Sequence, residues 1–331
     1  MRRVVITGAT GVVGMALINK CIELGIEAVV LVNPNSTRLG RIPSDPLVKV
    51  IKCGLEDLAV ADERSIGLTS LEPDGSGSSG DASCYADAMF HLAWGGTFGA
   101  ARNDKALQDK NHDYALDAVR LAGRLGCSVF VGVGSQAEYG RVSGKLTADT
   151  PCNPENEYGR SKLRTSVDTR ALCKELGIRH VWPRILSVYG PYDGEKTMVM
   201  SVISELLAGR KPALTAGEQQ WDFLYASDAT TALMLLAEKG KDGGIYPIGS
   251  GVARPLREYI EIIRDEIDPA LPLGIGEVPY SDKQVMYLCA DISKLCEDTG
   301  FAPSVSFREG IRRTIDHCKI AGKLQGNIRK K

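Results

Sequence analysis

The chain opens with an apolar strand pattern, a glycine-rich turn and a helical pattern in direct succession, and no other segment constrains the fold as strongly. The strand is expected over Val4 to Ile6 and the helix over Met15 to Leu24, with Gly8, Gly11 and Gly14 between them. In such a turn one glycine makes the bend, one lets backbone approach a pyrophosphate, and one lets the helix pack against its strand. Backbone N–H groups at the helix start would then meet the phosphates. The segment therefore predicts a dinucleotide-binding fold.

The rest of the first half alternates between strand-like and helical segments, which predicts an α/β fold with a Rossmann-type doubly wound parallel sheet. Further strands are expected at 28–32, 48–53, 88–92, 128–133 and 179–186, and helices at 107–125 and 158–176. Beyond position 186 the alternation weakens: one strand returns at 244–248, and helices are expected at 198–207, 255–267, 291–299 and 307–321. We expect residues 1–186, with 225–250 returning to them, to form the dinucleotide-binding domain. Residues 187–224 and 251–321 would form a smaller C-terminal substrate-binding lobe, and 322–331 a tail.

Composition argues against several kinds of partner. The net charge of the 331 residues is −1, which gives no electrostatic reason to bind nucleic acid or an anionic membrane. No apolar stretch is long enough to span a bilayer, and the first strand leaves no room for a signal peptide, so a cytoplasmic protein is expected. The nine cysteines and four histidines lack ligand spacing, so reduced thiols and no metal site are expected. His91, in an apolar run at a strand end, is expected to pack.

Two loops and the chain end interrupt the pattern. The segment Pro73–Gly80 contains nothing to bury and is expected to be a mobile surface loop. The segment Trp94–Gly99 follows the carboxyl end of a strand, where ligands bind in open α/β sheets, so it is expected to line the site, although a simple glycine-rich connection is an alternative. The basic residues 329–331 are expected to be a solvated tail.

Tyr158 and Lys162 are the candidate reactive pair. They lie one helical turn apart, so both side chains project from one face of the helix. A nearby ammonium would lower the pKa of the phenol toward a range useful for proton transfer. Ser135 follows the strand at 128–133, at the sheet edge where the glycine turn would place a nicotinamide, and its hydroxyl can hydrogen-bond a reacting oxygen. Tyr-x-x-x-Lys alone is also common on ordinary amphipathic helices, but the three features together favour catalysis.

These residues resemble the extended short-chain dehydrogenase/reductase family, the NAD-dependent epimerase/dehydratases that mostly act on nucleotide sugars. The resemblance covers nearly the whole chain. It is carried by the segments 8–14, 91–94, 135–140, 184–191, 221–225, 246–251 and 291–294, and by Asn111, Tyr158, Lys162 and Asp228. So many landmarks in the same order make a chance match improbable.

The resemblance implies a role for each matching residue. Tyr158 would be the acid–base at a sugar hydroxyl or carbonyl, Lys162 would bind the nicotinamide ribose, and Ser135 would orient the reacting oxygen. The cofactor would contact Gly8, Thr10, Gly11, Val12, Val13, Asn33, Ser36, Arg38, Gly54, Leu55, Leu92, Ala93, Trp94, Asn111, Tyr158 and Lys162. The substrate would contact Trp94, Thr97, Ser135, Gln136, Ser187 and Trp221, although Trp221 is equally well read as a core aromatic beside Phe223. A homodimer through helices of the first domain is a further expectation from the family.

Three departures from the family pattern bear on the reaction and the cofactor. Dehydratases usually place an Asp-Glu pair directly after the catalytic hydroxyl residue, whereas this chain has Gln136-Ala137, which disfavours dehydration. NAD-preferring members place a carboxylate at the end of the second strand, whereas the segment 32–38 has none. Arg38 in that segment could pair a 2′-phosphate, or it could be a solvated loop cation. Family members often have an acidic residue after the third strand that contacts adenine. This chain has Gly54-Leu55 in that region, although Asp57 follows.

The leading hypothesis is an NADPH-dependent reductase of a nucleotide-diphosphate 4-keto-6-deoxy sugar, with Tyr158 as the proton donor. One alternative is a nucleotide-sugar epimerase that keeps NAD tightly bound and both oxidises and reduces the same carbon. Another is a non-catalytic dinucleotide-binding scaffold or sensor, since the fold alone does not imply activity. The presence of Ser135, Tyr158 and Lys162 together argues against the scaffold.

Overall fold

The computed structural model describes residues 1–71 and 84–328. The loop predicted at Pro73–Gly80 and the basic end at 329–331 lie outside the described residues. No helix in the described part of the chain is both long enough and apolar enough to cross a bilayer.

The predicted Rossmann-type sheet is confirmed. Seven strands follow one another in the order β3 (Val48–Lys52), β2 (Glu27–Val32), β1 (Arg3–Thr7), β4 (Ala88–His91), β5 (Val129–Gly132), β7 (Arg179–Ile185) and β11 (Gly244–Ile248). Every pairing in this order is parallel, and a short strand β6 (Gly134–Ser135) also pairs with β7. Helices cover both faces, so the central strands are buried on two sides. Their sequences are therefore continuous apolar runs.

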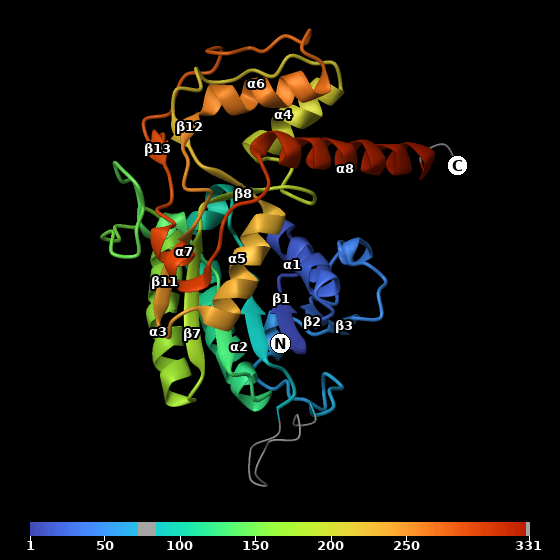
Figure 1. Ribbon diagram of the computed structural model, residues 1–331, viewed down its shortest axis with the longest axis vertical. Helices are drawn as coiled ribbons and strands as arrows, with labels where there is room; N and C mark the ends of the chain where they lie inside the picture. Colours follow the sequence, from blue (N-terminus) through green and yellow to red (C-terminus); the bar gives the residue numbers. More distant parts are fainter. Residues whose placement is uncertain (72–83, 329–331) are drawn as a thin grey trace.

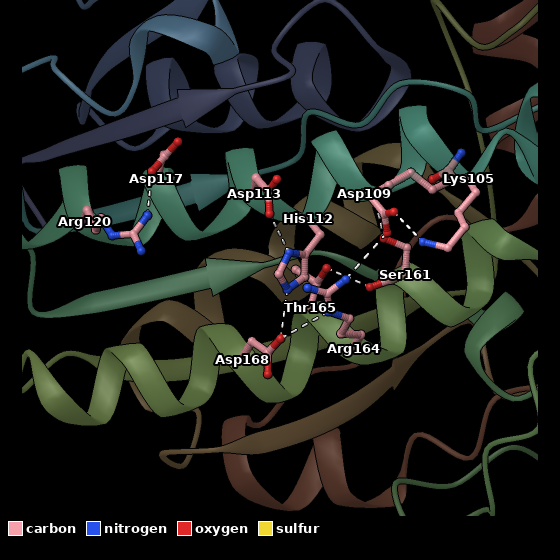
Figure 2. A network of polar contacts seen from close by, with 11 residues as sticks. Lys105, Asp109, His112, Asp113, Asp117, Arg120, Ser161, Arg164, Thr165 and Asp168 are labelled. Atoms are coloured by element: carbon pink, nitrogen blue, oxygen red, sulfur yellow. Dashed lines mark hydrogen bonds and ion pairs between the residues drawn. The ribbon is translucent and has the colours of Figure 1, made fainter.

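Helices lie on both faces of the sheet (Figure 1). On one face α1 (Val12–Glu23) and α5 (Ala226–Lys239) share a core with the sheet, and on the other α2 (Lys105–Arg124) and α3 (Glu157–Glu175) do so. The α2–α3 pair is fastened by polar contacts as well as packing: the Ser161 hydroxyl donates to the Gln108 carbonyl at 2.8 Å, and His112 and Asp168 are 2.8 Å apart. Figure 2 shows these contacts running along the seam between the two helices. The seam fixes the position of α3, which carries Tyr158 and Lys162.

A second lobe lies at one end of the molecule (Figure 1). Its core is formed by α4 (Met198–Leu207), α6 (Leu256–Ile267) and the start of α8 (Phe307–Ile328). Short strands connect it to the first domain: β8 (Ser187–Tyr189) pairs with β10 (Phe223–Tyr225), and β9 (Gln220–Trp221) pairs with β12 (Arg254–Pro255) and β13 (Tyr287–Leu288). None of these short strands was predicted.

The structure corrects two of the expected boundaries. Helix α7 (Ser293–Thr299) was placed in the second lobe, but Leu295 and Phe301 belong to the core that α1 and α5 share with the sheet, so this segment packs on the first domain. Helix α8 was expected to end at 321 and to be followed by a tail, whereas it continues to Ile328. In both cases the local pattern identified a helix, and for α7 the core that it packs on was decided by residues outside the segment.

A buried ion pair stands at the carboxyl end of the sheet. Glu138, in the short helix η4 (Gln136–Glu138), is fully buried, and its carboxylate accepts from the Arg184 guanidinium at 2.6 Å and from the Trp182 indole at 3.2 Å. The same carboxylate accepts from the backbone N–H of Ser135 at 2.8 Å. Every hydrogen bond of this carboxylate therefore holds β7 or the segment that presents Ser135.

We expect Glu138→Gln to lower the free energy of unfolding by about 3–5 kcal/mol, because it leaves the buried Arg184 without its counter-charge. Urea unfolding followed by circular dichroism measures the change. Glu205→Gln is the matched control, since its partner Arg210 is exposed and the change should be far smaller. Equal effects in the two variants would contradict the structural role given to the buried pair.

Candidate active site

The three glycines of the first turn have different structural surroundings. Gly8 has a φ of 74°, and a Cβ there would lie 2.5 Å from the backbone nitrogen of Ala93, so only glycine fits. A Cβ on Gly14 would lie 2.4 Å from the carbonyl oxygen of Gly8, which explains how α1 packs so closely onto the turn. Gly11 is the N-cap of α1, and no side chain caps that end. The first N–H groups of α1 are therefore open to an anion, which is what a dinucleotide pyrophosphate requires.

A cleft of about 1590 Å³ runs from this turn to the second lobe. Its volume exceeds that of a usual single-ligand pocket, so a cofactor and a second ligand can both fit. The lining includes all but two of the predicted site residues: Gly8, Thr10, Gly11, Val12, Val13, Asn33, Ser36, Arg38, Leu55, Leu92, Ala93, Trp94, Thr97, Asn111, Ser135, Tyr158, Lys162, Ser187 and Trp221. Most of the residues predicted to form the site therefore converge on one cavity.

Gly54 and Gln136 were predicted at the site but do not line the cleft. Gly54 is buried, and its N–H donates to the Asp57 carboxylate at 2.9 Å, so the next residue along the chain faces the cleft instead. Gln136 begins η4, where the backbone turns away from the cleft after Ser135. In both places a local turn, which the sequence does not reveal, decides which side chain is presented.

The predicted reactive residues come together at the first turn of α3. This helix begins after Asn156, whose side chain accepts from the Gly159 N–H at 2.9 Å, and Tyr158 and Lys162 follow on its buried face. Ser135, from β6, lines the same cleft, and its hydroxyl opposes the rise in the pKa of Tyr158. A tyrosine, a serine hydroxyl and a lysine at the end of the sheet form a group that can move a proton to or from one oxygen atom.

The expected effect of Lys162 on Tyr158 is not what the structure shows. Burial raises the pKa of Tyr158, and the groups that oppose this rise are the Ser135 hydroxyl and the Arg102 guanidinium. The Lys162 ammonium donates to the Val133 carbonyl at 2.6 Å and lies 3.7 Å from the centre of the Trp94 ring. Burial lowers the pKa of Lys162 to about 7, and the Glu138 charge partly opposes this shift. The loss of hydration on burial therefore has a larger effect on these pKa values than the Tyr158–Lys162 interaction that the helix spacing predicted.

The loop that follows β4 lines the site, as expected for Trp94–Gly99. Two buried side chains of α2 hold it: the Asn111 amide bonds both the N–H and the carbonyl of Gly95 at 2.9 Å, and Gln108 accepts from the Trp94 indole at 2.7 Å. The Trp94 ring meets the Tyr158 ring edge-on, with centroids 6.2 Å apart. The loop is therefore a wall of the cleft with a defined shape rather than a simple connection.

His91 has the packing role expected of it. Its ring is buried, contacts the Thr7 hydroxyl at 2.9 Å and stacks on Phe130. Burial lowers its pKa to about 3, so the ring is neutral at physiological pH. Among the residues that the structure describes, no group of three or more His, Cys, Asp or Glu side chains is arranged to hold a metal ion.

The end of the cleft beside the glycine turn contains two charged residues that were not predicted. Arg41 lines it together with Arg38, and the Arg41 guanidinium donates to the Thr10 carbonyl in the glycine turn at 3.3 Å. Glu56 also lines the cleft, whereas Asp57 caps its own short helix. A signal for Arg41 was available, because it lies three residues after Arg38 in the same segment.

At the other end of the cleft, two predicted substrate residues contact each other. The Trp221 indole donates to the Ser187 hydroxyl at 2.8 Å, and the Trp221 ring also packs against the core of the second lobe. Trp221 thus lines the cleft and also packs in the core of the lobe, and its contact with a substrate stays a prediction. Further lining residues from this lobe were not predicted: Asp193, Lys196, Met198, Leu214, Thr215, Gln219, Phe223, Ile260, Val278 and Gln284. Burial raises the pKa of Asp193 to about 6.

Known proteins similar in sequence are nucleotide-sugar dehydratases. The chain is 28% identical over 218 residues to a dTDP-glucose 4,6-dehydratase of Xanthomonas campestris, which is 60% of this chain and 62% of that protein. It is 26% identical over 208 residues to the dTDP-D-glucose 4,6-dehydratase of Mus musculus, which is 60% of this chain and 58% of that protein. The matches thus span less than two thirds of these relatives.

Solved structures of similar fold cover almost the whole chain. One is a UDP-N-acetylglucosamine 4-epimerase from Methanobrevibacter ruminantium, with a TM-score of 0.82 and 22% identity over 97% of this chain and 99% of that one. Another is a UDP-glucuronic acid 4-epimerase from Bacillus cereus in complex with NAD, with a TM-score of 0.78 and 20% identity over the same shares. At these identities the likeness shows the fold. The NAD dependent epimerase/dehydratase family model matches residues 4–249, and the chain belongs to that family.

Proposed function

We propose that this protein is an NADPH-dependent reductase that acts on the 4-keto-6-deoxy sugar of a nucleotide diphosphate. The observation that carries the proposal is that Ser135, Tyr158 and Lys162 line the same cleft as the glycine turn. The family supplies the general chemistry, and the nucleotide-sugar enzymes of similar sequence and fold supply the substrate class.

The residues of this chain would handle the proton and the orientation of the substrate. When bound, the nicotinamide supplies a hydride to the keto carbon. Tyr158 donates its phenolic proton to the carbonyl oxygen, so that the carbonyl becomes a hydroxyl and Tyr158 becomes a phenolate. Ser135 hydrogen-bonds the same oxygen, and Lys162 holds the ribose of the cofactor. The phenolate then regains its proton from solvent before the next turnover.

Dehydration is disfavoured because the residues after Ser135 have no free carboxylate. Ala137 is buried, Gln136 does not line the cleft, and neither can remove or deliver a proton as a carboxyl group would. Glu138 is a carboxylate, but it is fully buried and paired with Arg184. In this proposal the chain therefore lacks the acid–base pair that elimination of water needs, although its relatives in sequence are dehydratases.

NADPH is proposed over NADH because of the charges at the adenosine end. No carboxylate follows β2, and two guanidinium groups, those of Arg38 and Arg41, line the cleft there. A ribose 2′-phosphate is the group that would use them. Glu56 on the same wall is the feature that favours the alternative, an epimerase with tightly bound NAD, since a carboxylate can bond ribose hydroxyls.

The second lobe contributes charges of both signs to the cleft. Among the described residues that line the cleft, its charged members are Asp193, Glu195 and Lys196, beside uncharged groups such as Thr215 and Trp221. In this proposal Lys196 faces the substrate diphosphate. The expected homodimer stays a prediction, and the faces of α2 and α3 that it would use contain exposed charged side chains, including Lys105, Asp113 and Arg164 (Figure 2).

Tyr158→Phe should reduce turnover by about 10²–10⁴-fold and leave cofactor affinity nearly unchanged, because it removes the positioned proton donor and keeps the ring. Steady-state turnover and cofactor titration of the purified variant measure both effects. Tyr85→Phe, which changes a phenol outside the cleft, is the matched control. Near-normal turnover of the Tyr158 variant would remove the basis of the assignment.

Arg38→Ala should weaken binding of NADPH about tenfold or more and change NADH binding little, because only NADPH presents a phosphate to the guanidinium. Fluorescence titration with both cofactors tests this. Arg64→Ala, which removes an exposed arginine outside the cleft, controls for the loss of a surface charge. An equal loss for both cofactors would mean that Arg38 does not contact the 2′-phosphate.

Cofactor stoichiometry separates the reductase from the epimerase. A reductase releases NADP after each turnover, so little NAD should be found in the purified and denatured protein. Native protein mixed with NADPH and a panel of nucleotide 4-keto-6-deoxy sugars should lose NADPH absorbance in proportion to the sugar consumed. If stoichiometric NAD is released on denaturation and sugars interconvert without net oxidation of NADPH, the epimerase replaces the reductase.

A further inference from the structure

Tyr158 is contacted by a cation that belongs to neither the Tyr-x-x-x-Lys motif nor the cleft. The Arg102 guanidinium lies over the Tyr158 ring, with its central carbon 4.9 Å from the ring centre. Arg102 comes from the short helix η3 (Gly99–Asn103), in the loop between β4 and α2. It is not one of the residues that line the cleft. Its position is therefore suited to act on the tyrosine and not to bind the substrate.

The loop that carries Arg102 is fixed on both sides. The buried Gln108 amide donates to the carbonyls of Gly96 and Ala101 at 3.1 and 3.0 Å, which ties the loop to α2. The side chain of Asn103 accepts from the Glu157 N–H at 3.3 Å, which ties η3 to the start of α3. Arg102 thus lies between two anchored residues, one residue from each, and its approach to Tyr158 is built into the fold.

The other charged groups around Tyr158 interact with partners other than Arg102. Lys162, on the same helix, points its ammonium at the Val133 carbonyl and the Trp94 ring. Glu138, on η4, is the anion that disfavours the phenolate, and its charge is held by Arg184. Within the described parts of the chain, no carboxylate lies close enough to Arg102 to form an ion pair with it. Its charge is directed at the tyrosine, where it favours the phenolate form and opposes the effect of burial.

We propose that Arg102 is a positioning residue that stabilises the phenolate of Tyr158 from the side of the ring facing away from the cleft. The inference rests on the proposed function of Tyr158 as the proton donor, because the phenolate is formed as the proton leaves. Lys162 keeps its role at the cofactor ribose, and Arg102 supplies a further positive charge beside Tyr158.

The test reads the proton affinity of Tyr158 directly. A difluorotyrosine placed at position 158 titrates at lower pH than tyrosine, and its fluorine NMR shift reports the phenolate without any turnover. We expect Arg102→Met to raise its pKa by about one unit, as loss of a nearby opposite charge does. Arg102→Lys should restore at least half of that shift. Arg120→Met, which removes an exposed arginine paired with Asp117 on α2, should leave the pKa unchanged (Figure 2).

Kinetics provide the second readout. Arg102→Met should lower kcat about tenfold with little change in the KM for the sugar, because Arg102 lies outside the cleft. An unchanged fluorine titration in Arg102→Met overturns the proposal, as does a pKa that Arg102→Lys fails to restore. Arg102→Lys also keeps the test open if the Met variant does not fold. Failure of the proposed function is distinguishable: Tyr158→Phe would then retain turnover, whatever the fluorine titration of the Arg102 variants shows.

Discussion

The close backbone contact between Gly8 and Ala93 is the constraint on which the cleft depends. A Cβ at position 8 would lie 2.5 Å from the Ala93 nitrogen, so β1 and β4 can end side by side only because the residue is glycine. The chain that leaves β4 then passes directly into Trp94 and on to Arg102. That loop reaches the Tyr158 and Lys162 side chains on α3. One backbone contact therefore brings the phosphate turn and the reactive pair into the same cavity.

Burial then shifts the pKa values of the reactive groups. It raises the pKa of Tyr158 and lowers that of Lys162 to about 7, in each case against the charged form. Glu138 is the buried anion near both groups, and Arg184 and Trp182 fix its position. The Glu138 carboxylate has two structural consequences: it fastens the segment that presents Ser135, and its pairing with Arg184 holds it outside the lining of the cleft. The chemistry thus rests on a buried charge pair outside the cleft.

Long periodic elements were predictable, while short elements and packing partners were not. The helix expected at 158–176 is observed as Glu157–Glu175, and the strand expected at 179–186 as Arg179–Ile185, because each buries a regular face. Strands of two or three residues, such as Gln220–Trp221, are too short to show a period. The segment Ser293–Thr299 packs on the first domain because Leu295 is buried in the core of that domain. No feature inside the segment predicts this.

The sequence by itself determined the sheet, the glycine turn and the identity of the tyrosine, serine and lysine, because strand periodicity, glycine spacing and helical spacing are local properties. Tertiary structure alone decided which charges reach those residues. Arg102 is 56 positions from Tyr158 and Arg41 is 31 positions from Thr10, yet each pair is in contact. Electrostatic interactions and desolvation depend on distance in space and on exclusion of water, and both are set only when separate elements pack together.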